Sequence, residues 1–336
     1  MALRALDNTM PTTTPERPKK VAKLSAAAVV VPAASPEGKK KKNDENSAPK
    51  PTATTAAAAG EQAVEYVRSE DLQPMTHPKA KVAGLVADLD SKDWIRACEA
   101  LNDARRLAIH HSSLLNPILG KVMLAMVKTM KSPRSAVCKT AIMACTDVFE
   151  SFGNILSSSS TSDDAFDKLL LQLLLKASQD KRFVAEEAEK AMRAMAASMP
   201  PLPLLKKLKP YTRHANLRVR AKAAVAMSHC ASRMEIGAMR EFGMSAMLQA
   251  AAEMLSDRLP EAREAARAMV CSIHAAFCNE AAAAAKGKEE EGDLAGAGAD
   301  VAASWESLCS ISLPPISAQS VAKIVVSQSQ SQSQSQ

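Results

Sequence analysis

The sequence predicts an all-α solenoid in which five to six helix pairs stack in a row. Its composition favours helices, because aromatic residues make up only 3% of the chain and the 47% that are hydrophobic are mainly Ala, Leu, Met and Val. A four-residue apolar pattern with helical spacing recurs five times, and an apolar segment precedes each copy. Because one such helical hairpin cannot bury its apolar face alone, neighbouring hairpins are expected to stack around a continuous core.

The second helix of each pair is predicted from apolar residues at offsets 0, 4, 7 and 11, which share one helical face. The five faces are Ala97, Leu101, Ala104 and Ala108; Val137, Ala141, Ala144 and Val148; Val184, Ala188, Ala191 and Met195; Val219, Ala223, Ala226 and Cys230; and Ala262, Ala266, Met269 and Ile273. They recur every 35 to 47 residues, which is the period of HEAT and armadillo repeats.

The first helix of each pair is predicted in the apolar segment that precedes the face. These segments are 79–89, 114–130, 163–178, 201–210 and 236–255, and a sixth pair is predicted from 300–312 and 317–326. Local signals support the helix starts. Asp93 is placed to cap the second helix of the first pair, and Pro133 and Pro260 stand where a missing N–H costs little.

Composition divides the chain into five segments. Residues 1–65 are predicted to be a disordered basic arm, because they are rich in Pro, Thr, Ala and Lys and have no apolar period. The repeat domain is predicted over 66–280, a flexible linker over 281–300, a final helix pair over 301–326, and a disordered Ser-Gln tail over 327–336.

The turns inside the pairs carry positive charge. In a solenoid, turns of the same kind lie along one edge, and here they fall at 90–94, 130–135, 178–183, 212–218 and 256–260. The candidate binding residues are Trp94, Lys92, Lys131, Arg134, Lys181, Arg182, Arg213, Arg218 and Arg258. An aromatic anchor beside cations is the usual composition of a binding hot spot. Two alternatives stay open: these cations are simply solvated turn residues, and Trp94 is a structural staple between the first two helices.

The sequence argues against an enzyme. It contains no Gly-rich phosphate loop, no GxSxG and no HExxH, and His110 and His111 are adjacent, so they face different directions on a helix. None of the seven Cys forms a CxxC, so they are interpreted as small apolar residues in a reducing environment. We therefore expect no catalytic residues, no metal, no cofactor and no small-molecule substrate.

No run approaches the ~20 apolar residues of a membrane span, and the N-terminus lacks a secretory h-region. We therefore expect no membrane contact, whereas a transit peptide stays open because the first residues are rich in Ser, Thr, Ala and Lys. No heptad of useful length is present, so the oligomeric state stays open, and a monomer is the expectation.

The turns and the helices after them resemble a known family. "SKDWIRACEALNDARRL" is similar to the first repeat of a TOG domain, the HEAT-repeat tubulin-binding module of CLASP and related microtubule regulators. The resemblance rests there on Asp93, Trp94, Arg96, Ala100, Leu101 and Arg105. "SPRSAVCKTAIMACTDVFESFG" resembles the second repeat, and "HANLRVRAKAA" resembles the fourth, with Asn216, Arg218 and Arg220. The likeness covers about 66–278, and it is generic in the third and fifth repeats.

The resemblance implies a TOG-like HEAT-repeat fold whose turns bind the αβ-tubulin dimer or microtubules. Carried over by position, Trp94 would pack on tubulin. The basic residues of the later turns, with Asn216 added from the fourth, would meet the acidic surface of tubulin. It also implies a cytoplasmic location on the cytoskeleton. The second turn departs from the family pattern because it contains Pro133, and the choice between free dimer and lattice stays open.

The formal net charge of +7 suits an acidic partner, and residues 1–60 hold ten Lys and Arg against five Asp and Glu. The run Lys39, Lys40, Lys41 and Lys42 could hold acidic tubulin tails weakly or act as a nuclear localisation signal. The alternative function is therefore a HEAT/armadillo adaptor for another acidic protein, for which a nuclear location stays open. Nucleic acid is disfavoured as a partner, because stacking aromatics are absent.

Overall fold

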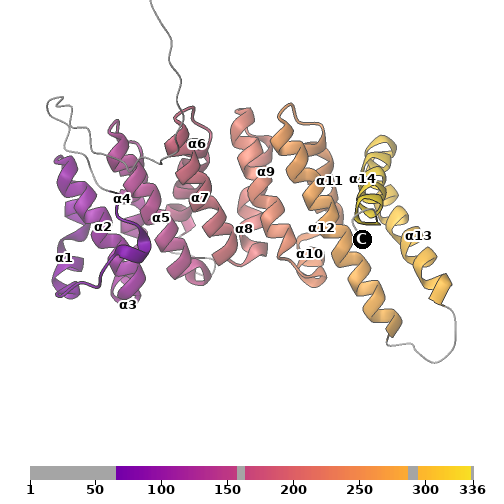
Figure 1. Cartoon of the computed structure of the whole chain (residues 1–336), viewed down its shortest axis with the longest axis horizontal. Helices are drawn as coiled ribbons and strands as arrows, with labels where there is room; N and C mark the ends of the chain where they lie inside the picture. Colours follow the sequence, from indigo (N-terminus) through magenta and orange to yellow (C-terminus); the bar gives the residue numbers. More distant parts are fainter. Residues whose placement is uncertain (1–65, 157–162, 287–293, 334–336) are drawn as a thin grey trace, which may run out of the picture. The chain divides into compact units, whose positions relative to one another are not determined.

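The computed structural model describes residues 66–156, 163–286 and 294–333, all within one unit of the chain, Gln62–Gln336. Each regular element in these residues is a helix, as Figure 1 shows. The predicted arm over 1–65, with its lysine run, lies outside them. In chain order the elements are η1 (Ser69–Asp71), α1 (Pro78–Leu89), α2 (Trp94–His110), α3 (Ser112–Leu115), η2 (Asn116–Ile118), α4 (Leu119–Met130), α5 (Ser135–Leu156), α6 (Asp163–Ala177), α7 (Arg182–Ser198), α8 (Pro201–Leu208), η3 (Lys209–Arg213), α9 (Leu217–Ser232), α10 (Ile236–Phe242), α11 (Met244–Leu255), α12 (Pro260–Lys286), α13 (Leu294–Ser312) and α14 (Pro315–Ser333).

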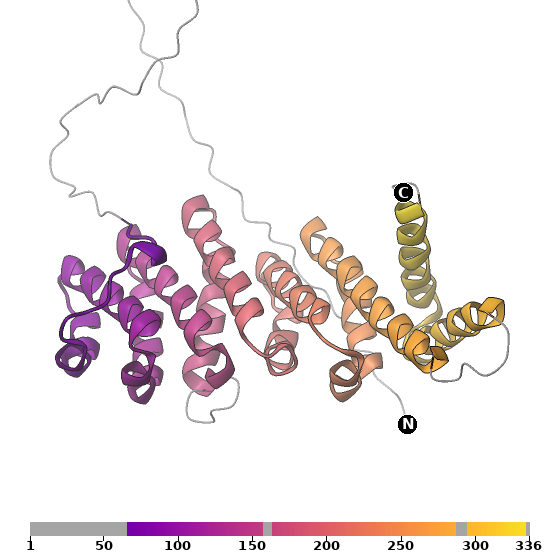
Figure 2. The same cartoon turned by 60° about the horizontal axis from the view of Figure 1, so that its bottom comes forward.

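The helices form a solenoid of pairs, which confirms the predicted fold class. The second helices contact one another in succession: α2 packs on α5, α5 on α7, α7 on α9, and α9 on α12. The first helices α1, α4 and α6 form a parallel series of contacts. Figures 1 and 2 show the pairs following one another in chain order along the row.

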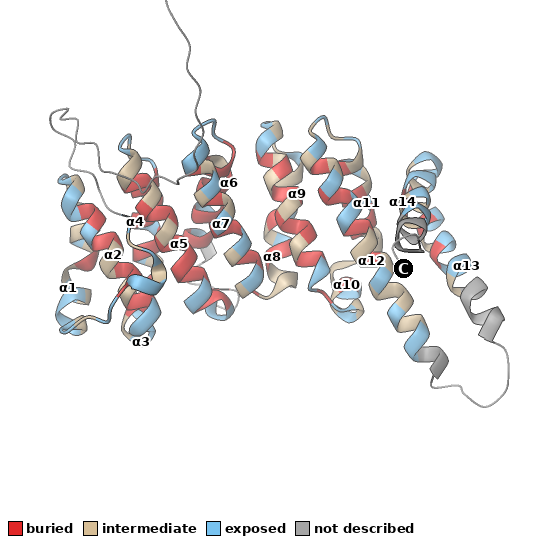
Figure 3. Cartoon of the chain, viewed as in Figure 1, coloured by how far each residue is buried: buried red, intermediate tan, exposed pale blue. Residues whose placement is uncertain are grey.

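The predicted apolar faces form the core. All twenty residues of the five faces are buried, and none is more than 3% exposed. All of them except Ala97 belong to one continuous apolar cluster that runs from α1 to α14. In Figure 3 the buried residues lie where neighbouring helices face each other, whereas the helix ends are mostly exposed. The period read from the sequence is therefore the period of the packing.

Local chemistry explains several helix boundaries. The Asp93 side chain accepts a hydrogen bond from the backbone N–H of Ile95 at 3.0 Å, which is the predicted cap of α2. Asn216 caps α9 in the same way, by accepting from the backbone N–H of Arg218 at 2.9 Å. Gly243 ends α10 with a φ of 102°, a left-handed conformation that favours glycine, and α11 starts immediately after it.

A buried ion pair joins the first two repeats to the segment before α1. Arg105 of α2 donates to Asp147 of α5 at 2.6 Å, and both side chains are 0% exposed. Arg105 also donates to the carbonyl of Val67 at 2.7 Å, and the Ser69 hydroxyl donates to Asp147 at 2.6 Å. Because the charges are paired and hydrogen-bonded, their burial is tolerated. The cluster holds residues 67–69 against α2 and α5.

The C-terminal region is more helical than the sequence indicates. Of the linker predicted over 281–300, residues 281–286 belong to α12 and residues 294–300 to α13, whereas residues 287–293 lie outside the described part. Five consecutive alanines at 281–285 explain the longer helix, because Ala has the highest helix propensity. The tail predicted to be disordered over 327–336 is helical up to Ser333, and residues 334–336 are not described.

The sixth pair, α13 and α14, packs on α11 and α12. Ser312, at the end of α13, has its hydroxyl 2.8 Å from that of Ser245, and its carbonyl accepts from Gln249 at 3.1 Å. Since Ser245 and Gln249 lie near the start of α11, the connection between α13 and α14 lies away from the turn that follows α11. The second tryptophan, Trp305, is 3% exposed and packs edge-on against His274, so it is a core residue.

We expect Gly153→Ala to destabilise the fold, because a Cβ at residue 153 would lie 2.5 Å from the backbone carbonyl oxygen of Ser198, at the end of α7. The cost should be roughly 1–3 kcal/mol of unfolding free energy, measured by urea denaturation. The control is Gly84→Ala in α1, where the new Cβ would meet Asp88 at 3.7 Å. That change should stabilise the helix by about 0.5–1 kcal/mol. Equal effects of the two substitutions would show that α5 and α7 do not approach this closely.

Candidate functional site

The intra-pair turns lie on one edge of the row, the upper edge in Figure 1. They span 90–93, 131–134, 178–181, 214–216 and 256–259, between the two helices of each pair. Contacts between neighbouring turns establish the alignment. Lys128, at the end of α4, reaches Asp90 of the first turn at 3.2 Å. Arg220, just after the fourth turn, donates to Asp257 of the fifth turn at 2.8 Å. We name this row of turns the turn edge.

Trp94 is the first residue of α2 and stands at the start of the turn edge. Its indole is partly buried and packs against the core cluster. The guanidinium carbon of Arg134, from the second turn, lies 5.1 Å from the centre of the indole ring, which is a cation–π contact. One part of the ring packs inward, as the staple interpretation expects, and Arg134 contacts another part at the edge. The role of Trp94 as a binding anchor stays a prediction.

Two predicted cations of the fourth repeat are paired with carboxylates of neighbouring pairs. Arg213 donates to Glu253, at the end of α11, at 3.0 and 2.5 Å. Arg218 is bonded to Asp180 of the third turn and also donates to the carbonyl of Ser178 at 3.3 Å. These pairs link successive repeats, and they neutralise part of the charge that the sequence offers.

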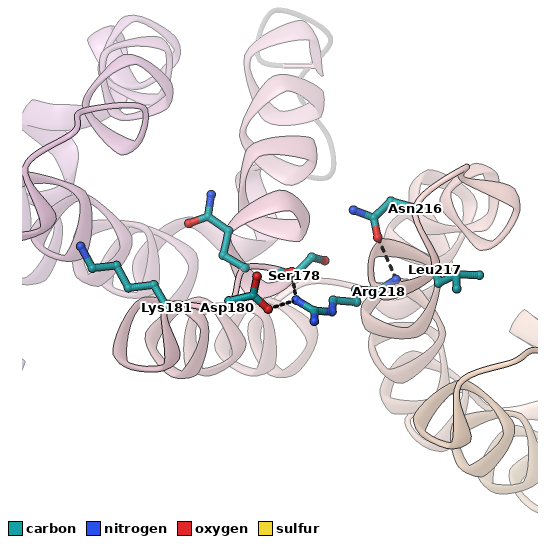
Figure 4. Close-up of a pocket in the computed structure, with 7 residues that line it drawn as sticks. Ser178, Asp180, Lys181, Asn216, Leu217 and Arg218 are labelled. Atoms are coloured by element: carbon teal, nitrogen blue, oxygen red, sulfur yellow. Dashed lines mark hydrogen bonds and ion pairs between the residues drawn. The ribbon is translucent and has the colours of Figure 1, made fainter. Parts of the chain in front are cut away.

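A hollow of about 690 Å³ lies between the third and fourth turns, as Figure 4 shows. Arg218 points across it toward Asp180, whereas Lys181 points away from Arg218. The carbonyl oxygen of the Asn216 side chain is directed at the backbone N–H of Arg218, so it serves as a cap. Asn216, predicted as a partner contact, is exposed. Its side-chain oxygen already accepts a hydrogen bond at the start of α9, so the amide nitrogen is the part of the side chain that this cap leaves unused.

The remaining predicted cations differ in whether their side chains have an ion-pair partner. Arg182 donates to Glu186 one turn along α7 at 2.7 Å, although its side chain is 90% exposed. Lys92, Lys131 and Arg258 are exposed, and within the described part of the chain their side chains have no ion-pair partner. Lys181 is exposed as well and has no ion-pair partner among the described residues. Cations without an ion-pair partner therefore lie near Trp94 and recur at the third and fifth turns.

Two exposed apolar side chains on the edge escaped the sequence analysis. Ile95 and Phe183, each in the first turn of a second helix, are both 39% exposed. The Lys181 ammonium lies 5.3 Å from the centre of the Phe183 ring. The signal for both was present, since each is an apolar residue that falls outside the buried face of its helix. They extend the apolar part of the edge beyond Trp94.

The described residues show no group of three or more His, Cys, Asp or Glu that could hold a metal ion. The seven cysteines are free thiols, five of them buried, and burial raises the pKa of Cys230 to about 12. A thiol with so high a pKa is a poor nucleophile. None of the helices in the described ranges is long and apolar enough to cross a membrane.

Comparisons with known proteins find both a curated relative and solved structures that are similar to this chain. A mouse protein named TOG array regulator of axonemal microtubules protein 1 is 30% identical over 125 residues, which are 37% of this chain and 7% of the mouse protein. The chain therefore spans only a small part of the length of the curated relatives it matches. No family model matches the chain.

Among solved structures, one from a study of microtubule plus-end tracking by XMAP215, CLIP-170 and EB1 is similar, with a TM-score of 0.52 and 15% identity. That similarity covers 76% of this chain and 94% of the other. The MAST/Orbit N-terminal domain is similar with a TM-score of 0.50 and 12% identity, over 73% of this chain and 96% of that one. At these identities the similarity shows a shared fold.

We expect the stability contributed by the ion pair between Arg220 and Asp257, which we call the clamp between the fourth and fifth turns, to depend on pH. Burial raises the pKa of Asp257, but hydrogen bonds from the backbone N–H of Leu259 and from Arg220 outweigh it, so its pKa lies below the ordinary 3.8. A lowered pKa gives stability that is present above pH 3.8 and is lost as pH falls through the folded-state pKa. The stability difference between the native chain and Asp257→Asn should therefore shrink as the pH falls from about 6 to about 3.

The measurement is urea unfolding at each pH, and Asp90→Asn, in the exposed first turn, is the control for removing a carboxylate from the same edge. A difference for Asp257→Asn that stays constant over this pH range would contradict the clamp.

Proposed function

We propose that this chain is a non-catalytic tubulin- or microtubule-binding protein that contacts its partner with the turn edge and so regulates microtubule dynamics or organisation. One observation carries the proposal: a partly exposed indole, Trp94, stands at one end of an edge on which cations of successive repeats are aligned. The resemblance of the first, second and fourth repeats to TOG domains supports tubulin as the partner. So does the relative whose name calls it a regulator of axonemal microtubules.

Within this proposal the contact centres on the first two turns. Trp94 is the anchor, because a large, partly preorganised aromatic side chain loses little freedom on binding. Lys92, Lys131 and Arg134 surround it and meet acidic residues of tubulin. Their pairing across the interface raises the association rate and fixes the orientation more than it adds affinity.

The later turns act as a second, weaker contact. Lys181 and Arg258 are available, whereas Arg182, Arg213 and Arg218 must exchange their own carboxylates for those of the partner. Such an exchange replaces one ion pair by another, so each of these residues contributes less than an unpaired cation would. We propose that they fix the direction of the edge on tubulin, together with the exposed amide of Asn216.

The proposal places the protein in the cytoplasm, on the cytoskeleton, as a monomer without cofactor. The arm, which carries Lys39, Lys40, Lys41 and Lys42, would add a weak, salt-sensitive attraction to acidic tubulin tails. The attraction is weak because salt screens exposed charges that are more than ~8 Å apart at physiological ionic strength.

The test compares two charge reversals on the same helix. Lys131 follows the C-terminus of α4 on the turn edge, and Lys121 is exposed near the other end of α4. Lys131→Glu and Trp94→Ala should each weaken binding to the tubulin dimer by roughly 1–3 kcal/mol, measured by sedimentation at low salt. Lys121→Glu makes the same change in net charge away from the edge and should have little effect.

Thermal melting of each variant separates loss of binding from loss of fold. Because Trp94 packs partly on the core, some loss of stability is expected for Trp94→Ala, whereas Lys131→Glu should melt like the native chain. Equal weakening by Lys131→Glu and Lys121→Glu would mean that attraction is non-specific. Absence of tubulin binding by the native chain at low salt would favour the adaptor hypothesis.

A further inference from the structure

The second turn contains a serine, Ser132, that is followed by a proline and lies between two basic residues. Residues 131–134 read Lys-Ser-Pro-Arg, and α5 begins at Ser135. Ser132 is partly exposed, and its hydroxyl accepts a hydrogen bond from the backbone N–H of Arg134 at 3.3 Å. Lys131, Pro133 and Arg134 on either side of it are exposed. The hydroxyl therefore lies at the surface, between two cations of the turn edge.

We propose that Ser132 is a phosphorylation site for a proline-directed serine kinase, and that the phosphate switches off the turn edge. The second half of this statement rests on the proposed function. The Ser-Pro pair is what a proline-directed kinase selects, and among the five turns only the second contains one. Ser132 lies two residues before Arg134, the residue that covers the Trp94 indole.

The reaction is an ordinary phosphoryl transfer from MgATP. The Ser132 Oγ attacks the γ-phosphorus, the Oγ–P bond forms, and the bond from the γ-phosphorus to the bridging oxygen of ADP breaks. The kinase supplies the base that accepts the hydroxyl proton, and ADP leaves. At pH 7 the serine then carries a charge of about −1.5 to −2 and three strong acceptor oxygens.

The phosphate changes the charge of the second turn and the contacts of Arg134. Lys131 and Arg134 give this turn two positive charges, which the phosphate offsets almost completely. The group also lies just before the N-terminus of the 22-residue helix α5, where a negative charge is stabilised. Arg134 can form charge-assisted hydrogen bonds to the phosphate, and in doing so it leaves the Trp94 ring. The anchor loses its cation, and an acidic partner meets a turn whose positive charge is almost fully neutralised.

The experiment uses the full chain with Thr14→Ala and Ser35→Ala, which remove its other Thr-Pro and Ser-Pro pairs, and with Trp305→Phe, which leaves Trp94 as the single tryptophan. The chain is treated with a proline-directed serine kinase and MgATP, and the modified residue is located by mass spectrometry. We expect phosphate on Ser132 and stronger acrylamide quenching of Trp94 emission. Binding of the tubulin dimer at low salt should weaken by about fivefold or more.

The matched control carries Ser132→Ala as well, and kinase treatment should change neither its mass, its Trp94 emission nor its binding. Failure of the kinase to modify Ser132 in the folded chain would overturn the proposal. So would phosphate on Ser132 without any change in Trp94 quenching. Because quenching is measured without tubulin, these outcomes decide the proposal even if the unmodified chain fails to bind tubulin, which would refute the proposed function alone.

Discussion

The structure depends on one constraint: the apolar face of each second helix can be buried only by the next helix pair. An isolated hairpin would leave residues such as Leu101 in water, and burying one leucine side chain is worth about 1.5–3 kcal/mol. Stacking buries Leu101 completely, and it does the same for the corresponding residues of all five faces. The stacking also fixes which polar residues meet. Ion pairs join residues 37–40 positions apart, about one repeat, as in Arg220 with Asp257 and Arg213 with Glu253.

The same stacking creates the candidate binding surface. Because every pair is oriented alike, the short turns must follow one another along one edge, and residues that are remote in sequence become neighbours there. Arg134 covers Trp94 only because the second turn lies beside the first. Stacking also brings carboxylates to the edge, however, and Asp180 neutralises Arg218. Arg213 and Arg218 of the fourth repeat are therefore offset by carboxylates. Lys92 and Lys131, near Trp94, have no ion-pair partner among the described residues, so a partner with an acidic surface would be held most firmly there.

The sequence predicted what depends on local order and missed what depends on pairing between repeats. The apolar faces and the Asp93 cap follow from spacing along one helix, and both are confirmed. The engagement of Arg213 by Glu253 could not be read from a single turn, because the two residues meet only after stacking. The extension of α12 to Lys286 differs from the predicted linker because the five alanines before Lys286 have a high helix propensity. The roles of the candidate residues in binding stay predictions.

The central claim is that the turn edge is the surface that meets tubulin. Hydrogen exchange of the backbone amides, followed by mass spectrometry with and without the tubulin dimer, tests it most directly, because it maps protection along the whole chain at once. We predict slower exchange on binding at residues 90–96 and 131–137, weaker protection around 178–184 and 256–262, and no change in the connections between pairs at 111–118 and 233–236. Protection confined to those connections, with unchanged exchange around Trp94, would contradict the central claim.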